Sequence, residues 1–265
     1  MSDNTIVKHE QGLEQLKQLV TDSLTSLNSR VAYDKALTDF LAWYQSTGQR
    51  GLIKATVAEY KTYLQGLGYA PSTINQRLSA IRKLAIEAAD NGLMDAQLAN
   101  GVARVKGVKS SGVRTGNWLT KDQAQRLLDA PDITTLKGLR DRAILAVMLG
   151  AGLRRSEVAA LTFEHIQQRE GRWVIVDLIG KGKRVRTVPI PSWAKQAIDE
   201  WTQTAGISEG RIFRAVNKGD RLAGESLTSQ AVQDVVKAYA KQCGFELAAH
   251  DLRRTFAKLA RKGGA

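Results

Sequence analysis

The stretch GAGLRRSE, residues 150–157, combines groups that suit a phosphate. Its two glycines end one predicted helix, and Ser156 is a candidate cap for the next. Arg154 and Arg155 then lie at a helix start, where exposed backbone N–H groups favour anions. Guanidinium forks bind phosphate oxygens in pairs, and Glu157 in the first turn can hold an arginine in place. For an isolated motif of this kind, a solvated arginine pair is the preferred interpretation.

A second stretch, GKGKRVR over residues 180–186, lies between two runs rich in β-branched residues and predicts a hairpin tip. Glycines permit a tight turn and the close approach of another backbone. A lysine such as Lys181 could reach a phosphate there or donate a proton to a leaving oxygen. The alternative is a basic, solvated turn. A phosphate-cradling P-loop is excluded, since its spacing and its following helix are missing.

A third stretch, HDLRRTF over residues 250–256, predicts a helix with two distinct faces. Leu252, Phe256 and Leu259 form an apolar stripe, which we expect to be buried. His250 and Arg253, three residues apart, share another face. Such a pair suits one phosphate, because the arginine neutralises charge and the histidine donates a hydrogen bond or moves a proton. By itself, His250 is as well explained as a structural helix-end histidine.

Together and in this order, the three stretches resemble the tyrosine recombinases, a family that includes phage integrases and Xer-type chromosome resolvases. The family pattern Gly-x-Arg-x-x-Glu is matched by residues 152–157, and Gly-Lys-Gly followed by Val-Pro is matched at 180–182 and 188–189. His-x-x-Arg is matched at 250–253. The resemblance extends to the family's core-binding (SAM-like) domain, where PSTINQRL at 71–78 matches a common helix start.

The resemblance implies a C-shaped clamp around duplex DNA. Arg154 and Arg253 would bind the scissile phosphate, Glu157 would support them, His250 would assist proton movement, and Lys181 would protonate the leaving 5′-oxygen. A tyrosine would attack the phosphate and form a 3′-phosphotyrosyl link, so that strands are exchanged and rejoined without ATP. Neither a metal ion nor another cofactor is expected.

The partner implied is duplex DNA, on which copies of the full-length protein would assemble as dimers or tetramers. The residues expected to contact DNA besides the catalytic set are Ser72, Thr73, Asn75, Arg77, Lys183, Arg184 and Arg254.

The chain departs from the family pattern after residue 253. The family continues with a second histidine or a tryptophan and then with the nucleophilic tyrosine, whereas the tyrosines here are Tyr33, Tyr44, Tyr60, Tyr63, Tyr69 and Tyr239. None follows His250, and we assign none as the nucleophile. We therefore expect a chain truncated before that tyrosine, which binds duplex DNA without cutting it and self-assembles weakly.

Two domains must position these stretches. We predict a mainly α fold with a small β-hairpin or sheet (α+β). Its parts are a helical, SAM-like core-binding domain over residues 1–104, a basic linker over 105–117, and a catalytic domain over 118–265 that is incomplete at its C-terminus.

In the first domain, residues 1–20 predict a weak helix or a loose tail, and apolar residues recur at helical spacing from about residue 29 to residue 90. The apolar positions are Leu37, Phe40, Leu41, Tyr44, Val57, Tyr60, Leu64 and Leu67, and then Ile74, Leu78, Ile81, Leu84 and Ala85. The last helix carries a polar face made of Asn75, Arg77, Arg82 and Lys83.

In the second domain, Thr120 and Gln123 fit a capping box that opens a helix running through Leu128. Further helices are predicted at 138–149, 156–161, 194–202, 229–241 and 251–261. The predicted hairpin joins residues 173–179 to residues 185–190.

The 265 residues carry a formal net charge of +13, which attracts polyanions such as nucleic acid. One cysteine excludes an intrachain disulfide and a cysteine-rich zinc site. No signal-peptide pattern opens the chain, and the longest apolar run, at 143–149, is too short to span a bilayer. We expect a cytoplasmic, nucleoid-associated protein with no membrane partner.

Two other functions stay open. A non-enzymatic DNA-binding regulator, or an architectural remnant of a recombinase, fits the charge and the helices but leaves the ordered Arg, Lys and His-x-x-Arg set unexplained. A metal-dependent nuclease requires clustered carboxylates, and the sequence offers only Asp251 beside His250.

Overall fold

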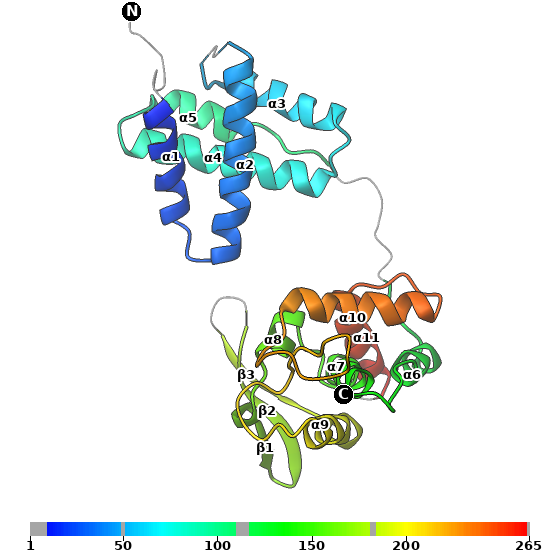
Figure 1. Cartoon of the computed structure of the whole chain (residues 1–265). Coiled ribbons are helices and arrows are strands. Elements are labelled where there is room, and N and C mark those ends of the chain that lie inside the picture. Colours follow the sequence, from blue (N-terminus) through cyan, green and yellow to red (C-terminus); the bar gives the residue numbers. More distant parts are fainter. Residues whose placement is uncertain (1–9, 49–50, 110–116, 181–183, 264–265) are drawn as a thin grey trace, which may run out of the picture. The chain divides into compact units, whose positions relative to one another are not determined.

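The computed structural model describes residues 10–48, 51–109, 117–180 and 184–263 (Figure 1). The chain divides into two compact units, residues 1–113 and residues 114–265. The predicted fold class is confirmed, since helices dominate both units and a small antiparallel sheet lies in the second. No described helix is both long and apolar enough to cross a membrane.

The first unit is helical throughout its described part. Its helices are α1 (Glu10–Asp22), α2 (Leu27–Ser46), α3 (Lys54–Gly66), α4 (Pro71–Asp90) and α5 (Ala96–Ala103). Helix α4 contacts each of the other four and is therefore the centre of the unit. Pro71 occupies its first turn, where the missing N–H costs nothing because no intrahelical acceptor exists there.

The apolar spacing of this unit predicted most of its core. All five apolar positions named for α4 are buried, as are Leu37, Phe40, Leu41 and Tyr44 of α2. Leu67 is exposed, contrary to the prediction, because α3 ends at Gly66 and the chain turns there. The first residues described form a regular helix whose Leu16 and Val20 are buried, so this segment is firmer than the predicted weak helix.

The predicted polar face of α4 is wrong at Arg77. This side chain is buried and forms an ion pair with Asp39 at 2.7 Å. It also donates a hydrogen bond to the Tyr60 hydroxyl at 3.3 Å and stacks over the ring of Tyr69. A buried guanidinium needs such partners to offset its desolvation, which explains why an arginine is tolerated inside this helical core.

Part of the predicted linker packs on α4. Val105 is buried in the core of the first unit. The Asn75 side chain accepts a hydrogen bond from the Val108 N–H at 2.8 Å and donates one to the Val108 carbonyl at 2.9 Å. Asn75 thus satisfies both backbone polar groups of Val108, as a neighbouring β-strand would. Both polar atoms of the Asn75 side chain are therefore hydrogen-bonded inside the unit. Residues 110–116 of the predicted linker lie outside the described residues.

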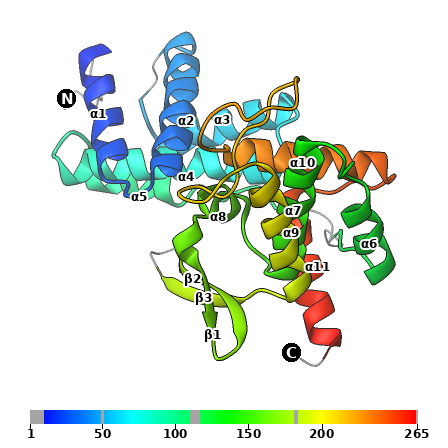
Figure 2. The same cartoon turned by 60° about the horizontal axis from the view of Figure 1, so that its bottom comes forward.

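The described part of the second unit combines six α-helices with three strands. They are α6 (Lys121–Asp129), α7 (Leu136–Gly150), α8 (Arg155–Ala160), a 3₁₀ turn η1 (Phe163–His165), β1 (Ile166–Arg169), β2 (Arg172–Ile179), β3 (Val185–Pro189), α9 (Ser192–Thr204), α10 (Ser229–Gln242) and α11 (Ala249–Lys262). The strands pair antiparallel in the order β1-β2-β3, and Figure 2 shows them side by side. The predicted hairpin is the β2–β3 pair.

Helix α7 holds the core of this unit together. Its residues 143–149 are all buried, and it contacts α6, α8, α9, α10 and α11. Burying one such aliphatic side chain stabilises the fold by about 1.5–3 kcal/mol before entropy is counted. The predicted capping box of α6 is confirmed, since Thr120 and Gln123 bond each other's backbone N–H groups at 2.9 and 3.2 Å. The apolar helix α7 is therefore a rigid support for the turn that follows it.

Candidate active site

The turn after α7 places Arg154. Gly152 has a φ of +60°, in the left-handed region that glycine adopts without steric cost. A Cβ atom at this position would lie 2.4 Å from a ring carbon of Phe256, so glycine also makes room for α11. Arg154 is the N-cap residue of α8, and its backbone N–H donates to Glu157 at 2.8 Å. The predicted cap, Ser156, is wrong, since this residue is exposed inside the first turn of α8.

Glu157 is a buried carboxylate shared by two arginines. Its Oε1 accepts from Arg154 Nη1 at 2.8 Å and from Arg186 Nη1 at 2.9 Å. Its Oε2 accepts from Arg186 Nη2 at 2.8 Å and from the Arg154 N–H. Burial alone would raise the pKa of Glu157, but the hydrogen bonds from Arg186 and Arg154 outweigh it and hold that pKa below its usual value. The expected contact of Glu157 with an arginine is present, and Arg186 is an additional partner.

Helix α11 brings Arg253 to the same turn. Arg253 Nη1 donates a hydrogen bond to the Gly152 carbonyl, a contact across about a hundred residues of sequence. Burial, followed by the charges of Arg154 and Arg186, lowers the pKa of Arg253 below the usual arginine value. Arginine nonetheless stays charged in proteins. Three guanidinium groups, those of Arg154, Arg186 and Arg253, therefore gather at one place.

A pocket of about 350 Å³ opens between the turn and the start of α11. Its described lining includes Arg154, Arg155, His250 and Arg253 and contains no carboxylate. His250 is exposed and Arg154 half-buried, so solvent reaches both. The N-terminus of α11 also faces this region and favours negative charge. This arrangement suits a tetrahedral anion such as a phosphodiester.

The remaining predicted site residues divide into several groups. Lys181 and Lys183 lie outside the described residues. Arg184 is exposed directly before β3, and Arg254 is exposed with an ion pair to Asp251 at 3.0 Å. At the start of α4, Ser72 is exposed and Thr73 half-buried, whereas Asn75 and Arg77 make the internal contacts described above. Sequence reasoning missed Arg186, and its position just beyond the basic hairpin tip was the one available signal.

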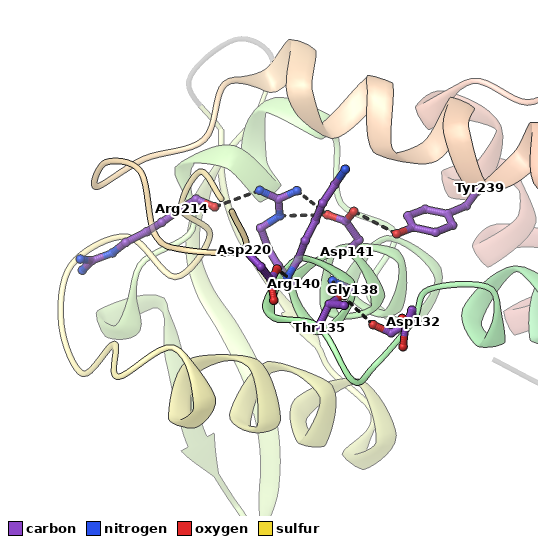
Figure 3. A network of polar contacts seen from close by, with 9 residues as sticks. Asp132, Thr135, Gly138, Arg140, Asp141, Arg214, Asp220 and Tyr239 are labelled. Atoms are coloured by element: carbon purple, nitrogen blue, oxygen red, sulfur yellow. Dashed lines mark hydrogen bonds and ion pairs between the residues drawn. The ribbon is translucent and has the colours of Figure 1, made fainter. Parts of the chain in front are cut away.

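Tyr239 belongs to a structural network (Figure 3). Its hydroxyl donates to Asp141 Oδ2 at 3.2 Å, while Arg140 donates to Asp141 Oδ1 through two nitrogens at 2.9 and 2.7 Å. Burial and the neighbouring Asp141 carboxylate raise the pKa of Tyr239 well above its usual value. Burial raises the pKa of Asp141 as well, against the opposing charge of Arg140. The hydroxyl of Tyr239 thus anchors α10 to α7.

The same network continues to the start of α7. Arg140 Nη1 donates to the Arg214 carbonyl at 3.4 Å, and the Asp220 carboxylate accepts from the N–H groups of Leu136 and Lys137 at 2.7 and 2.8 Å. The loop between α9 and α10 is thereby fastened to the helix that carries the arginine turn (Figure 3).

Comparisons with known proteins define the class. Residues 117–264 match the model of the Phage integrase family, and residues 16–92 match that of the Phage integrase, N-terminal SAM-like domain. A tyrosine recombinase of Synechococcus elongatus is 30% identical over 258 residues, which cover 90% of this chain and 77% of the relative. Tyrosine recombinase XerC of Pseudomonas entomophila is 33% identical over 194 residues, covering 72% of this chain and 60% of the relative.

Solved structures agree on the fold. The XerH site-specific recombinase bound to a palindromic difH substrate has a TM-score of 0.70 at 16% identity, covering 97% of this chain and 75% of that one. A lambda integrase dimer bound to a COC′ core site has a TM-score of 0.71 at 16% identity, covering 98% and 72%. This chain belongs to the phage integrase family, and the relatives named above are tyrosine recombinases.

Proposed function

We propose that the protein is a site-specific DNA recombinase that binds duplex DNA and holds a scissile phosphate in the pocket beside Arg154. The observation that carries this proposal is the convergence of Arg154, Arg253 and His250, which come from two sequence stretches about a hundred residues apart. Three guanidinium groups beside a single buried carboxylate leave an excess of positive charge, which is what a phosphoryl transition state requires.

Each side chain then has a defined task in the proposed reaction. Arg154 and Arg253 bind the non-bridging phosphate oxygens, since each uses one terminal nitrogen on a described residue and has further N–H donors. His250, exposed at the pocket, donates a hydrogen bond or moves a proton. Lys181 protonates the leaving 5′-oxygen. In the full-length protein a tyrosine attacks the phosphate and gives a 3′-phosphotyrosyl link, which conserves the bond energy for rejoining. Carboxylates that could hold a metal ion do not cluster among the described residues.

The surface beyond the pocket is proposed to contact the DNA backbone. Ser72 and Thr73 at the start of α4, with Arg184, Arg254 and the lysines of the hairpin, remain in this set. Asn75 and Arg77 are better explained by their internal contacts. That the XerH and lambda integrase structures are DNA complexes supports DNA as partner, and the lambda dimer supports assembly of copies on a site. The proposed location is the cytoplasm, on the nucleoid.

We further propose that a protein of these 265 residues binds duplex DNA without cutting it. Tyr239 is held by Asp141, and it precedes His250, whereas the family nucleophile follows the His-x-x-Arg motif. Such a protein would behave as a DNA-binding regulator. A nicked suicide duplex tests this point, because a covalent protein–DNA adduct on a denaturing gel would contradict it.

The phosphate site is tested by binding measurements on a labelled duplex that is first selected from random sequence with this protein. We expect the logarithm of the affinity to fall linearly with the logarithm of salt concentration. Arg154→Ala and Arg253→Ala should each weaken binding and reduce that slope by about one unit. Arg172→Ala is the control, since Arg172 is exposed at the far end of β2. If neither site variant differs from the control in affinity or footprint, the site assignment is wrong.

A further inference from the structure

Arg186 and Arg154 share one carboxylate although they belong to different elements. Arg186 lies on β3 and Arg154 at the start of α8, and both terminal nitrogens of Arg186 donate to Glu157, at 2.9 and 2.8 Å. Arg154 uses only Nη1 on the same carboxylate. With the Arg154 N–H as fourth donor, Glu157 accepts two hydrogen bonds at each oxygen, which fills its usual capacity.

The pairing of β3 with β2 places Arg186 there. Ile175 pairs with Val188 and Leu178 pairs with Arg186, so β2 has two residues between the pairs where β3 has one. Asp177, in this bulge, has a φ of +55°. Directly opposed residues share one face of a sheet, and Leu178 is buried. Val188, two residues further along β3, pairs with the buried Ile175, so Arg186 lies on the same inner face, and the bulge in β2 brings Leu178 rather than Asp177 opposite it.

The division of N–H donors between Arg186 and Arg154 decides which arginine is available to an anion in the pocket. Arg186 directs both terminal nitrogens at Glu157 and does not line the pocket. Among the described residues, none is bonded to the second terminal nitrogen of Arg154, whose side chain is 41% exposed. Guanidinium and carboxylate favour a two-bond fork. Without Arg186, Glu157 would be free to take both terminal nitrogens of Arg154, and the pocket region would lose one positive charge.

We propose that Arg186 is a positioning residue of the phosphate site. By forming a two-bond fork with Glu157, Arg186 leaves the second terminal nitrogen of Arg154 available to the phosphate. The inference rests on the proposed function, because it assigns Arg186 a task at that same pocket. Arg186 itself does not touch the phosphate. It acts through Glu157, and it also links β3, which follows Lys181 in sequence, to the arginine turn.

Inorganic phosphate is the probe, titrated into the 265-residue protein and followed by the Nε–Hε NMR signals of its arginines. The variants are Arg186→Ala, Arg186→Lys and the double variant Arg186→Ala with Glu157→Gln, with Arg172→Ala as the matched control. We expect Arg186→Ala to weaken phosphate binding by roughly five- to tenfold, the scale of one lost hydrogen bond in an open, solvated pocket. Arg186→Lys should lie between, because an ammonium occupies fewer carboxylate lone pairs than the guanidinium fork.

The double variant distinguishes a positioning role of Arg186 from a purely structural ion pair between Arg186 and Glu157. A glutamine at 157 cannot compete as an anion for Arg154, so the double variant should recover to within about twofold of the original affinity. A purely structural contact predicts the opposite, a further loss when the second partner is removed. Unchanged affinity in Arg186→Ala, or a deeper loss in the double variant, would overturn the inference.

Arg154→Ala and Arg253→Ala, titrated in parallel, distinguish this failure from failure of the proposed function. If they abolish phosphate binding while Arg186→Ala does not change it, the site stands and the role of Arg186 is wrong. If they bind phosphate as the original protein does, the site itself is wrong. Circular dichroism confirms that each variant is folded, and if Arg186→Ala is not, Arg186→Lys and its combination with Glu157→Gln give the same comparison.

Discussion

Replacing Gly152 by alanine tests how the arginine turn is built. The left-handed backbone at this position, with φ +60°, costs a residue with a Cβ atom about 1–2 kcal/mol. The new methyl group would lie 2.4 Å from one ring carbon of Phe256 and 2.9 Å from two others, an overlap that neither the ring nor the backbone can absorb freely. Overpacking of this kind costs about 1–3 kcal/mol. We therefore expect Gly152→Ala to lower the free energy of unfolding of the second unit by roughly 2–5 kcal/mol.

Urea unfolding followed by tryptophan fluorescence measures this change, because Trp118, Trp173, Trp193 and Trp201 all lie in the second unit. Gly206→Ala is the control, with a φ of +66° and no heavy atom within 4 Å of the added Cβ. It should lose only the backbone part, about 1–2 kcal/mol. If Gly152→Ala costs no more than this control, Phe256 does not press on the turn and the reasoning fails.

Two further predictions concern the network and the buried carboxylate. Tyr239→Phe removes one hydrogen bond to the buried Asp141 and should lower the free energy of unfolding by roughly 1–3 kcal/mol, measured by urea unfolding. The DNA affinity, measured by fluorescence anisotropy, should not change. A folded Tyr239→Phe variant with weaker DNA binding would give Tyr239 a role that its contacts do not predict. The pKa of Glu157 is lowered in the fold, so this carboxylate stabilises the protein above its ordinary pKa of 4.5, and that contribution is lost as the pH falls through the lowered value. Urea midpoints measured between about pH 3 and pH 6 should therefore fall with acid, and Glu157→Gln should flatten part of that fall; an unchanged pH profile would show that Glu157 is not held ionised by its arginines.

The fold was largely predictable from sequence where one signal dominated. The 3.6-residue spacing of α4 and the capping box of α6 are local patterns, and both elements were found. Strand β1 was missed because its four residues, Ile166–Arg169, are mostly polar and exposed and show no alternation. Strand β1 forms because it pairs with the edge of β2, and such pairing depends on tertiary structure rather than on the local sequence.

The site was predictable in its residue types but not in its connections. The motif that contains Arg154 and Glu157 implied a contact between them, which the structure contains. Nothing in the spacing showed that Arg186 would join the same carboxylate, because that contact joins β3 to α8 across 29 residues of sequence. The basic residues of α4 show the opposite error. From sequence alone, Arg77 cannot be told from an exposed arginine, yet it forms an ion pair with Asp39 and is buried in the core.

Gly152 shows why motifs so distant in sequence belong to one site. The residue ends the turn after α7 and leaves room for Phe256, and its carbonyl accepts the hydrogen bond from Arg253. Both Arg253 and Phe256 belong to α11 and lie about one turn apart, so the helix contacts this glycine through two of its side chains. A side chain at 152 would push α11 away and move Arg253 from Arg154. The absence of a side chain at one position thus sets the distance between the two arginines that the proposed reaction needs.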